Sequence, residues 1–153
     1  MTTTVAIGVG NLFRNDDGVG IVVARSLGKK LREQRLPPPD ICESSGEGTE
    51  LISAWEGYDQ AYVFDAVMHR GQTGRIYRLE ASRDNLPTDF FKYSSHAFSL
   101  AEAVEMSRVL DRLPDKLVVF GIEGEDFAFG EALSAGVMAA SEKVVDAVIA
   151  ELQ

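Results

Sequence analysis

Short apolar runs separated by glycine and polar residues are the strongest pattern along the chain. A run of three to eight apolar residues is too short for a helix of ordinary length and is typical of a buried strand. Such runs occupy residues 5–7, 61–64 and 117–122, and we predict that they form the central strands of a sheet. A fourth strand is predicted at residues 40–43.

A fifth strand is predicted at residues 75–80, where Ile76 and Leu79 alternate imperfectly with polar residues. Only a short, glycine-containing link, residues 68–74, separates it from the preceding strand region. A parallel pair needs a crossover of a dozen or more residues. We therefore expect this strand to be antiparallel and to lie near an edge of the sheet.

Four longer segments carry apolar residues at helical spacing, every three or four positions. They predict helices at residues 18–34, from a glycine-rich turn at 46–51 through Trp55, at 97–113 and at 135–152. Ser94 or Ser95 is expected to cap the third of these helices. The expected buried positions in the first, third and fourth helices are Val23, Leu27 and Leu31; Leu100, Val104 and Leu110; and Val137, Ala140, Val144 and Val148.

Strands that alternate with helices predict an α/β protein. We expect a three-layer α/β/α fold with a mostly parallel sheet of about five strands and one antiparallel edge strand. No internal repeat, low-complexity segment or linker divides the 153 residues. A single domain spanning residues 1–153 is therefore predicted.

Composition and charge indicate which binding partners and which cellular compartment to expect. The net charge of −9 argues against nucleic-acid and anionic-membrane partners, because binding to phosphates depends on Lys and Arg. A lone cysteine, Cys42, permits no internal disulfide; it suits a reducing compartment and is expected to be a small buried hydrophobe. With no apparent signal peptide or membrane span, we expect a cytoplasmic protein.

The candidate chemistry begins in the segment VAIGVGNLFRNDDGVG, residues 5–20, which predicts a strand, a sharp turn and the start of a helix. A dinucleotide-binding G-x-G-x-x-G pattern would need glycine at position 13, where the chain has Phe13. Two aspartates, Asp16 and Asp17, also precede the helix, where the phosphates of a dinucleotide would bind to free backbone N–H groups and would face these negative charges instead. Dinucleotide binding is therefore not favoured.

Asp17 follows the first strand, Asp65 ends the strand at residues 61–64, and His96 precedes a helix. The carboxyl ends of parallel strands meet at one edge of a sheet, so these side chains could share a crevice. Two carboxylates and an imidazole suit a divalent first-row metal. An aspartate at a strand end is also common as a turn residue, and a histidine beside serines as a hydrogen-bonded loop residue.

Other candidate sites are weaker. The chain has no G-x-S-x-G, C-x-x-C, H-E-x-x-H or P-loop motif, which argues against the common serine-hydrolase, zinc and nucleotide sites. His69, the other histidine, is expected to be exposed to solvent. The acidic residues Glu123, Glu125 and Asp126 are interpreted as a solvated loop.

Four blocks in order, GVGNLFRNDDGVG, VFDAV, SSHAFSLAE and FGIEGEDFAFGEALS, resemble the nickel–iron hydrogenase maturation endopeptidases over nearly the whole chain. The resemblance implies a peptidase that removes the C-terminal extension of a hydrogenase large-subunit precursor after nickel insertion. It also implies that Asp17, Asp65 and His96 are the metal-contacting and catalytic residues. Asp17 stands where many members have glutamate, and Glu43, Ser44 and Ser45 replace an Asp-Gly-Gly motif.

In that family the nickel is carried by the substrate, so the resemblance implies no tightly bound cofactor of the protein's own. The expected partner is the large-subunit precursor, with no nucleic acid or membrane, and the protein is expected to be a monomer. Two alternatives stay open. One is a nickel-sensing or metallochaperone module that binds the immature subunit without cleaving it. The other is an enzyme like peptidyl-tRNA hydrolase, although Leu12 and Phe13 replace the Pro-Gly of that family and the negative charge opposes tRNA binding.

Overall fold

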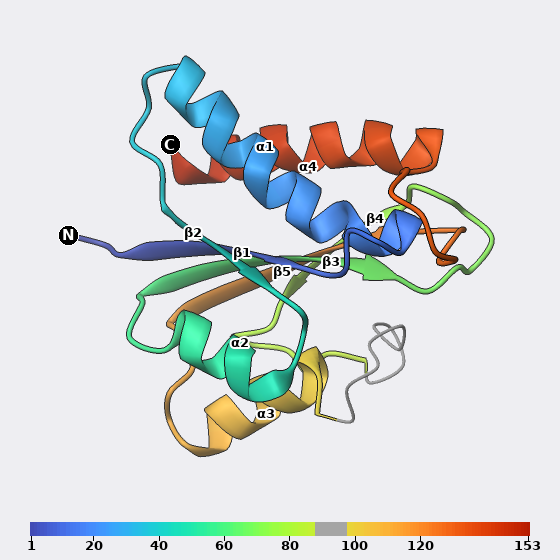
Figure 1. Cartoon of the computed structure of the whole chain (residues 1–153). Coiled ribbons are helices and arrows are strands. Elements are labelled where there is room, and N and C mark those ends of the chain that lie inside the picture. Colours follow the sequence, from blue (N-terminus) through green and yellow to red (C-terminus); the bar gives the residue numbers. More distant parts are fainter. Residues whose placement is uncertain (88–97) are drawn as a thin grey trace.

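The computed structural model describes residues 1–87 and 98–153, and its five strands form one sheet in the order β2-β1-β3-β5-β4 (Figure 1). The first four of these strands run parallel, and β4 pairs antiparallel with β5 at the edge. Both the mostly parallel sheet and its antiparallel edge strand are confirmed. The strands are β1 (Thr4–Val9), β2 (Asp40–Ser44), β3 (Gln60–Val67), β4 (Ile76–Glu80) and β5 (Lys116–Glu123).

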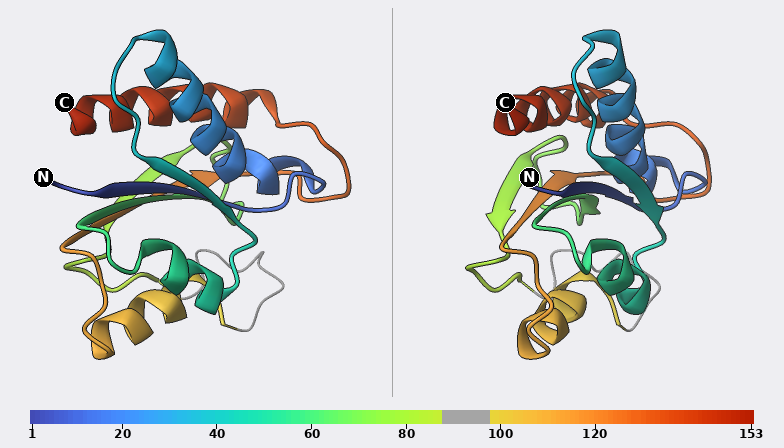
Figure 2. Two further views of the ribbon diagram at one scale, coloured as in Figure 1. Left: turned by 60° about the vertical axis from the view of Figure 1, so that its left-hand side comes forward. Right: turned by 90° about the vertical axis from the view of Figure 1, so that its left-hand side faces the viewer.

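Helices cover both faces of the sheet and complete the three layers that the sequence predicts (Figures 1 and 2). Helices α1 and α4 lie side by side on one face, and α2 and α3 lie on the other. A single 3₁₀ turn, η1, leads directly into α1. The bounds are η1 (Asn15–Gly18), α1 (Val19–Glu33), α2 (Gly48–Trp55), α3 (Leu100–Val109) and α4 (Ala135–Leu152).

The predicted central strands are the three inner strands, β1, β3 and β5. In β3, Tyr62 and Phe64 pack into the apolar cluster beneath α1 and α4, whereas Val63 and Val67 pack into the cluster beneath α2 and α3. Strands that are buried on both faces read as continuous apolar runs. This is why the sequence predicted these three strands clearly.

The start of α1 lies unusually close to the sheet. A Cβ at Gly20 would lie 2.2 Å from the carbonyl oxygen of Phe64 and 2.3 Å from that of Val9. Only glycine permits this approach to both β1 and β3. The contact fixes the loop before α1 at the carboxyl edge of the two strands.

Helix α3 differs from the prediction. It begins at Leu100, with Ser99 as the N-cap residue, and not at residue 97; Ser94 and Ser95 lie outside the described residues. Leu100 and Val104 are buried as expected, but Leu110 is 50% exposed. The helix ends at Val109 and Asp111 has a positive φ of 55°, so the chain turns away before Leu110 can join the buried face.

Cys42 is half-buried, and the prediction of a buried side chain was wrong. It lies in β2, an edge strand with one neighbour, so part of its side chain stays accessible. In the described ranges, no helix combines the length and the apolar character that crossing a membrane requires.

Candidate active site

The candidate site lies where the direction of the chain's crossovers reverses. From β1 the chain crosses through α1 to β2 on one side, and then returns through α2 to β3 on the other side of β1. Ligand sites of open α/β sheets lie at such a switch point, outside the carboxyl ends of the strands. Asp17, in η1 just after β1, lies there, and η1 contacts β3.

Asp65 lies inside β3, because the strand continues to Val67; the prediction that the strand ends on Asp65 was wrong. The residue pairs with Gly121 of β5, and side-chain alternation puts it on the same face as Val63 and Val67. Its side chain is 9% exposed. In the part of the chain that is described, its carboxylate accepts one hydrogen bond, from the N–H of Ala66 at 2.8 Å.

Asp17 and Asp65 interact electrostatically. Burial raises the pKa of Asp65 well above the ordinary aspartate value, and the nearby negative charge of Asp17 raises it further. Burial also raises the pKa of Asp17, although the N–H of Asn11 and the charge of Arg14 oppose the shift. Two poorly hydrated carboxylates of like charge are relieved by a proton or by a cation between them. The pair can therefore hold a cation or carry a proton.

The loop that carries Asp17 is fixed by Gly10. This residue has a φ of +148°, and a Cβ on it would lie 1.9 Å from the carbonyl oxygen of Asp17. The N–H of Gly10 donates to the carbonyl of Ser44 at 3.0 Å, and the N–H of Asn11 donates to that of Asp17 at 3.3 Å. The backbone of Gly10 and Asn11 therefore packs directly against the backbone of Asp17 and fixes its position.

Asp16, the neighbouring acid, has a different environment. It is fully buried and accepts four hydrogen bonds: from the N–H groups of Glu125 and Asp126 at 3.0 Å each, and from the N–H and hydroxyl of Ser134 at 2.7 Å each. Burial alone would raise the pKa of Asp16, but these hydrogen bonds outweigh it and hold the pKa below the ordinary value. Asp16 therefore acts as a structural junction at the start of the helix.

His96, the third predicted ligand, lies outside the described residues. Over residues 1–87 and 98–153, no group of three or more His, Cys, Asp or Glu side chains is arranged to hold a metal ion. The structure thus brings Asp17 and Asp65 together, and the complete set of Asp17, Asp65 and His96 stays a prediction.

Sequence reasoning missed Glu123. Expected in a solvated loop, it is fully buried at the end of β5 and accepts hydrogen bonds from the N–H groups of Arg70 at 3.0 Å and Gln72 at 2.6 Å. The hydroxyl of Tyr77 also donates to it, at 3.3 Å. It fixes the link between β3 and β4. The uninterrupted apolar run that leads into it was the available signal, whereas Glu125 and Asp126 are exposed as predicted.

The other two candidates have defined partners. His69 is exposed, as predicted, with Nδ1 3.1 Å from the carbonyl oxygen of Gly124, an arrangement in which Nδ1–H donates. Glu43, which replaces the first residue of the Asp-Gly-Gly motif, forms a two-point ion pair with Arg25, at 2.6 and 2.9 Å. The hydrogen bond from Arg25 lowers the pKa of Glu43. This carboxylate is therefore already paired on the surface.

Comparisons with known proteins agree with the motif blocks. The family model described as hydrogenase maturation protease (HycI) matches residues 26–151. The chain belongs to the hydrogenase maturation protease family. The Hydrogenase 2 maturation protease of Escherichia coli (strain K12) is 26% identical over 153 residues, covering 97% of this chain and 90% of that protein. The hydrogenase expression/formation protein HoxM of Cupriavidus necator is 25% identical over 93% of this chain and 70% of its own length.

Solved structures of hydrogenase maturation proteases share the fold. The hydrogenase maturating endopeptidase HybD from E. coli superposes with a TM-score of 0.75 at 21% identity, covering 99% of this chain and 92% of that one. The [NiFe] hydrogenase maturation protease HybD from Thermococcus kodakarensis gives a TM-score of 0.70 at 18% identity, covering 99% and 100%. The resemblance seen in the sequence is confirmed, and this maturation protease is a peptidase and not a peptidyl-tRNA hydrolase.

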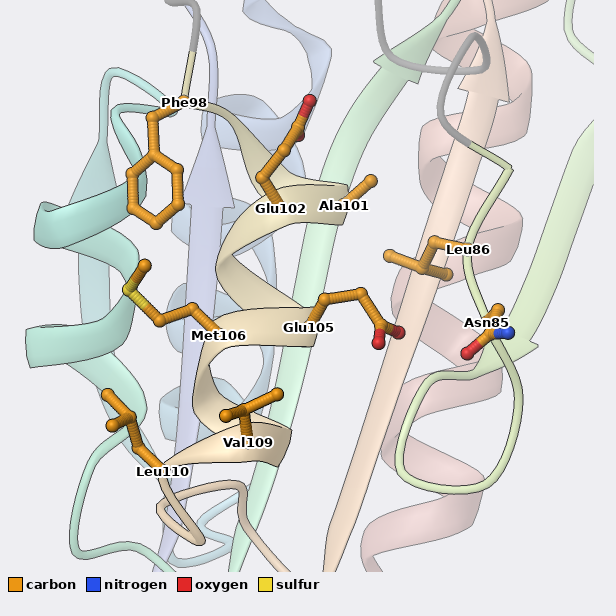
Figure 3. A pocket seen from close by; sticks show the side chains of 9 residues that line it. All are labelled: Asn85, Leu86, Phe98, Ala101, Glu102, Glu105, Met106, Val109 and Leu110. Carbon is orange, nitrogen blue, oxygen red and sulfur yellow. The ribbon is translucent and has the colours of Figure 1, made fainter.

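This maturation protease also has a groove of 770 Å³ along the outer side of α3, between that helix and the segment after β4 (Figure 3). Neither Asp17 nor Asp65 lines it. Its walls are mostly apolar, with two glutamates of α3 among them, and they offer no candidate for peptide cleavage. The lining residues are Asn85, Leu86, Phe98, Ala101, Glu102, Glu105, Met106, Val109 and Leu110.

Proposed function

We propose that this maturation protease removes the C-terminal extension of a nickel–iron hydrogenase large-subunit precursor after nickel has been inserted. Asp17, Asp65 and His96 recognise the nickel ion that the precursor carries. In this proposal the ion is part of the substrate, and the protein has no tightly bound cofactor of its own.

The observation that carries the proposal is the electrostatic state of the carboxylate pair. Asp65 is buried beside Asp17, and both pKa values are raised chiefly by burial. Such a pair is unfavourable while both groups are ionised, and a divalent cation presented by a bound substrate would remove the repulsion. Binding free energy would then be gained mainly with the metal-loaded precursor.

Ligand chemistry supports nickel recognition of this kind. Carboxylate and imidazole groups bind nickel, and they can complete the coordination of an ion that the precursor already holds through softer ligands. The proposed ligands come from separate segments of the chain, so ordering them around a free ion costs conformational entropy. We therefore expect weak binding of free nickel by the protein alone.

The same pair supplies groups for proton transfer during cleavage. A general base or acid works best when its pKa lies near the working pH. The raised pKa of Asp65 makes it the better matched proton carrier of the two, with Asp17 beside it. The substrate's nickel ion would polarise the scissile carbonyl or position the attacking water.

The test is to incubate the purified protein with nickel-loaded and nickel-free forms of candidate large-subunit precursors. Mass spectrometry then measures both cleavage products. We expect one cut near the C-terminus of the nickel-loaded form of one precursor, and no cut in its nickel-free form. Equal cleavage of the two forms would overturn nickel recognition. Nickel-dependent binding without cleavage, with every precursor, would instead favour the non-cleaving metallochaperone alternative.

A further inference from the structure

Two phenylalanine rings are exposed beside the candidate site. Phe13 is 64% exposed in the loop between β1 and α1, and Phe129 is 86% exposed in the loop between β5 and α4. The two loops lie side by side at the same end of the molecule (Figures 1 and 2). Exposed aromatic side chains that gather in one place are characteristic of interaction surfaces.

Hydrogen bonds join the backbones of the two loops that carry the rings. The carbonyl of Phe13 accepts from the N–H of Gly130 at 2.9 Å, and the carbonyl of Gly130 accepts from the N–H of Asn15 at 2.8 Å. The side chain of Asn15 accepts a further bond from the N–H of Ala132 at 3.1 Å. The backbone positions of both rings are therefore fixed before a partner binds, which reduces the ordering cost of association.

Arg14, which follows Phe13 in the chain, reaches across to the other loop and contacts the Phe129 ring. Its Nε donates to the carbonyl of Phe127 at 3.1 Å, and its guanidinium carbon lies 5.3 Å from the centre of the Phe129 ring. A guanidinium over an aromatic face gains cation–π attraction and keeps the ring oriented. We call Phe13, Arg14 and Phe129 the aromatic patch.

The aromatic patch is close in the chain to Asp17, and the charge of Arg14 acts on the Asp17 carboxylate. Phe13 and Arg14 belong to the same short loop as Asp17, and the loop that carries Phe129 is bound to Asp16 through the N–H groups of Glu125 and Asp126. A polypeptide bound at the patch would therefore be held next to the segment that carries Asp17.

Charges around the patch indicate the chemistry of its occupant. Glu125, Asp126 and Glu131 are exposed on the same loop as Phe129, and the whole chain carries a net charge of −9. Arg14 is the basic group within the patch, and it already contacts Phe129. The surface therefore suits apolar side chains flanked by basic ones.

We propose that the aromatic patch docks a segment of the large-subunit precursor in which apolar residues are flanked by basic residues. Docking there brings the bond to be cleaved to Asp17 and Asp65. The inference rests on the proposed function, and it adds a recognition surface that is separate from the nickel ligands.

The test measures binding apart from cleavage. In an Asp65→Asn background, which is expected not to cleave, the affinity for the nickel-loaded precursor is measured with and without Phe13→Ala and Phe129→Ala. We expect the double substitution to weaken binding about tenfold to hundredfold, as for aromatic anchors of other interfaces. With Asp65 restored, the same double substitution should raise KM and leave kcat nearly unchanged. Higher salt should weaken binding of the parent protein.

Val109→Ala is the matched control, because Val109 is 83% exposed but lies on α3, in the groove of Figure 3. It should leave the affinity unchanged, and thermal unfolding should show that all variants are folded. Affinity of the double variant within twofold of its parent would overturn the inference, as would a loss of affinity with Val109→Ala instead. A dimer that the double variant abolishes, with precursor binding unchanged, would also overturn it. Undiminished cleavage by Asp65→Asn would count against the proposed function. The effect of the double substitution on affinity would still test the aromatic patch independently.

Discussion

Asp16 and Asp17 are adjacent in sequence, yet they belong to two regions with opposite electrostatic character. The Asp16 junction satisfies its carboxylate with four hydrogen bonds, and its pKa is lowered. The Asp17–Asp65 pair has raised pKa values, chiefly because of burial. A carboxylate that accepts several hydrogen bonds is stable in its ionised form and stabilises the fold. A buried pair of carboxylates is unfavourable when both are ionised, and it is suited to binding a cation or a proton. The comparison separates, within a single turn, an acid whose charge the fold stabilises from an acid whose pKa the fold raises.

The largest expected effect is on cleavage when the pair is broken. Asp65→Asn should lower the rate of precursor processing on the order of a thousandfold, since it removes a proton carrier and a negative charge. Quantitative mass spectrometry of the cleaved extension measures the rate. Asp115→Asn, at an exposed position before β5, is the control and should cleave at the normal rate. A rate for Asp65→Asn within tenfold of the parent would remove Asp65 from the site.

The two neighbouring acids should differ in the same assay. Asp17→Asn should impair processing more than Asp16→Asn when both are measured at a temperature where each protein is folded. Asp17 belongs to the pair, and Asp16 contacts only groups of the fold in the described residues. A larger loss of processing with Asp16→Asn than with Asp17→Asn would contradict the division between the two regions.

His96→Ala is likewise expected to abolish processing while the protein stays folded, as judged by circular dichroism.

Stability should show the reverse pattern. Asp16→Ala should lower the free energy of unfolding by about 2–4 kcal/mol, because the N–H groups of Glu125, Asp126 and Ser134 and the hydroxyl of Ser134 lose a buried, charged acceptor. Urea denaturation measures the change, and Asp17→Ala in parallel should cost less. If the two substitutions cost the same, hydrogen bonding would not distinguish the regions.

A smaller loss of stability is expected at the other buried carboxylate. Glu123→Gln should cost about 1–2 kcal/mol, because Oε2 accepts from the N–H groups of both Arg70 and Gln72, and the neutral amide oxygen of glutamine is a weaker acceptor than a carboxylate oxygen. Glu142→Gln, exposed on α4, is the control and should change the unfolding midpoint little. Equal midpoints for the two variants would show that Glu123 does not hold the β3–β4 link.

The finest difference between the regions is the pH dependence of stability. Asp65 has a raised pKa, so the native state keeps its proton longer, and stability falls as pH rises from the unfolded value, about 4, to the native one. Asp65→Asn should therefore be more stable than the parent at neutral pH, with the difference shrinking on acidification. Asp16 has a lowered pKa, so its contribution is present above about pH 4 and is lost as pH falls through its native value. Urea denaturation of the parent, Asp65→Asn and Asp16→Ala across this pH range measures how the free energy of unfolding depends on pH. The contributions of Asp65 and Asp16 should have opposite slopes.

Much of the fold followed from local sequence patterns. Runs such as residues 117–122 indicated strands buried on both faces, and the short link after β3 indicated an antiparallel edge strand. Predictions failed where the boundary depended on neighbouring elements: β3 passes through Asp65, α3 ends before Leu110, and Cys42 is partly exposed on an edge strand. Glu123 was misjudged because an acidic residue after a strand usually faces water, and its burial depends on donors from the link between β3 and β4.

By itself, the sequence determined the layer architecture, the inner strands and the motif blocks of a hydrogenase maturation protease, because apolar periodicity and residue order are local properties. It also proposed Asp17 and Asp65 as partners. Only the tertiary structure decided that strand order brings these two carboxylates to one switch point. It also decided that Asp16, one residue away, is saturated by a loop from the far end of the chain. Burial and hydrogen bonding depend on residues distant in sequence, and these long-range contacts shift the pKa of Asp16 down and those of Asp17 and Asp65 up.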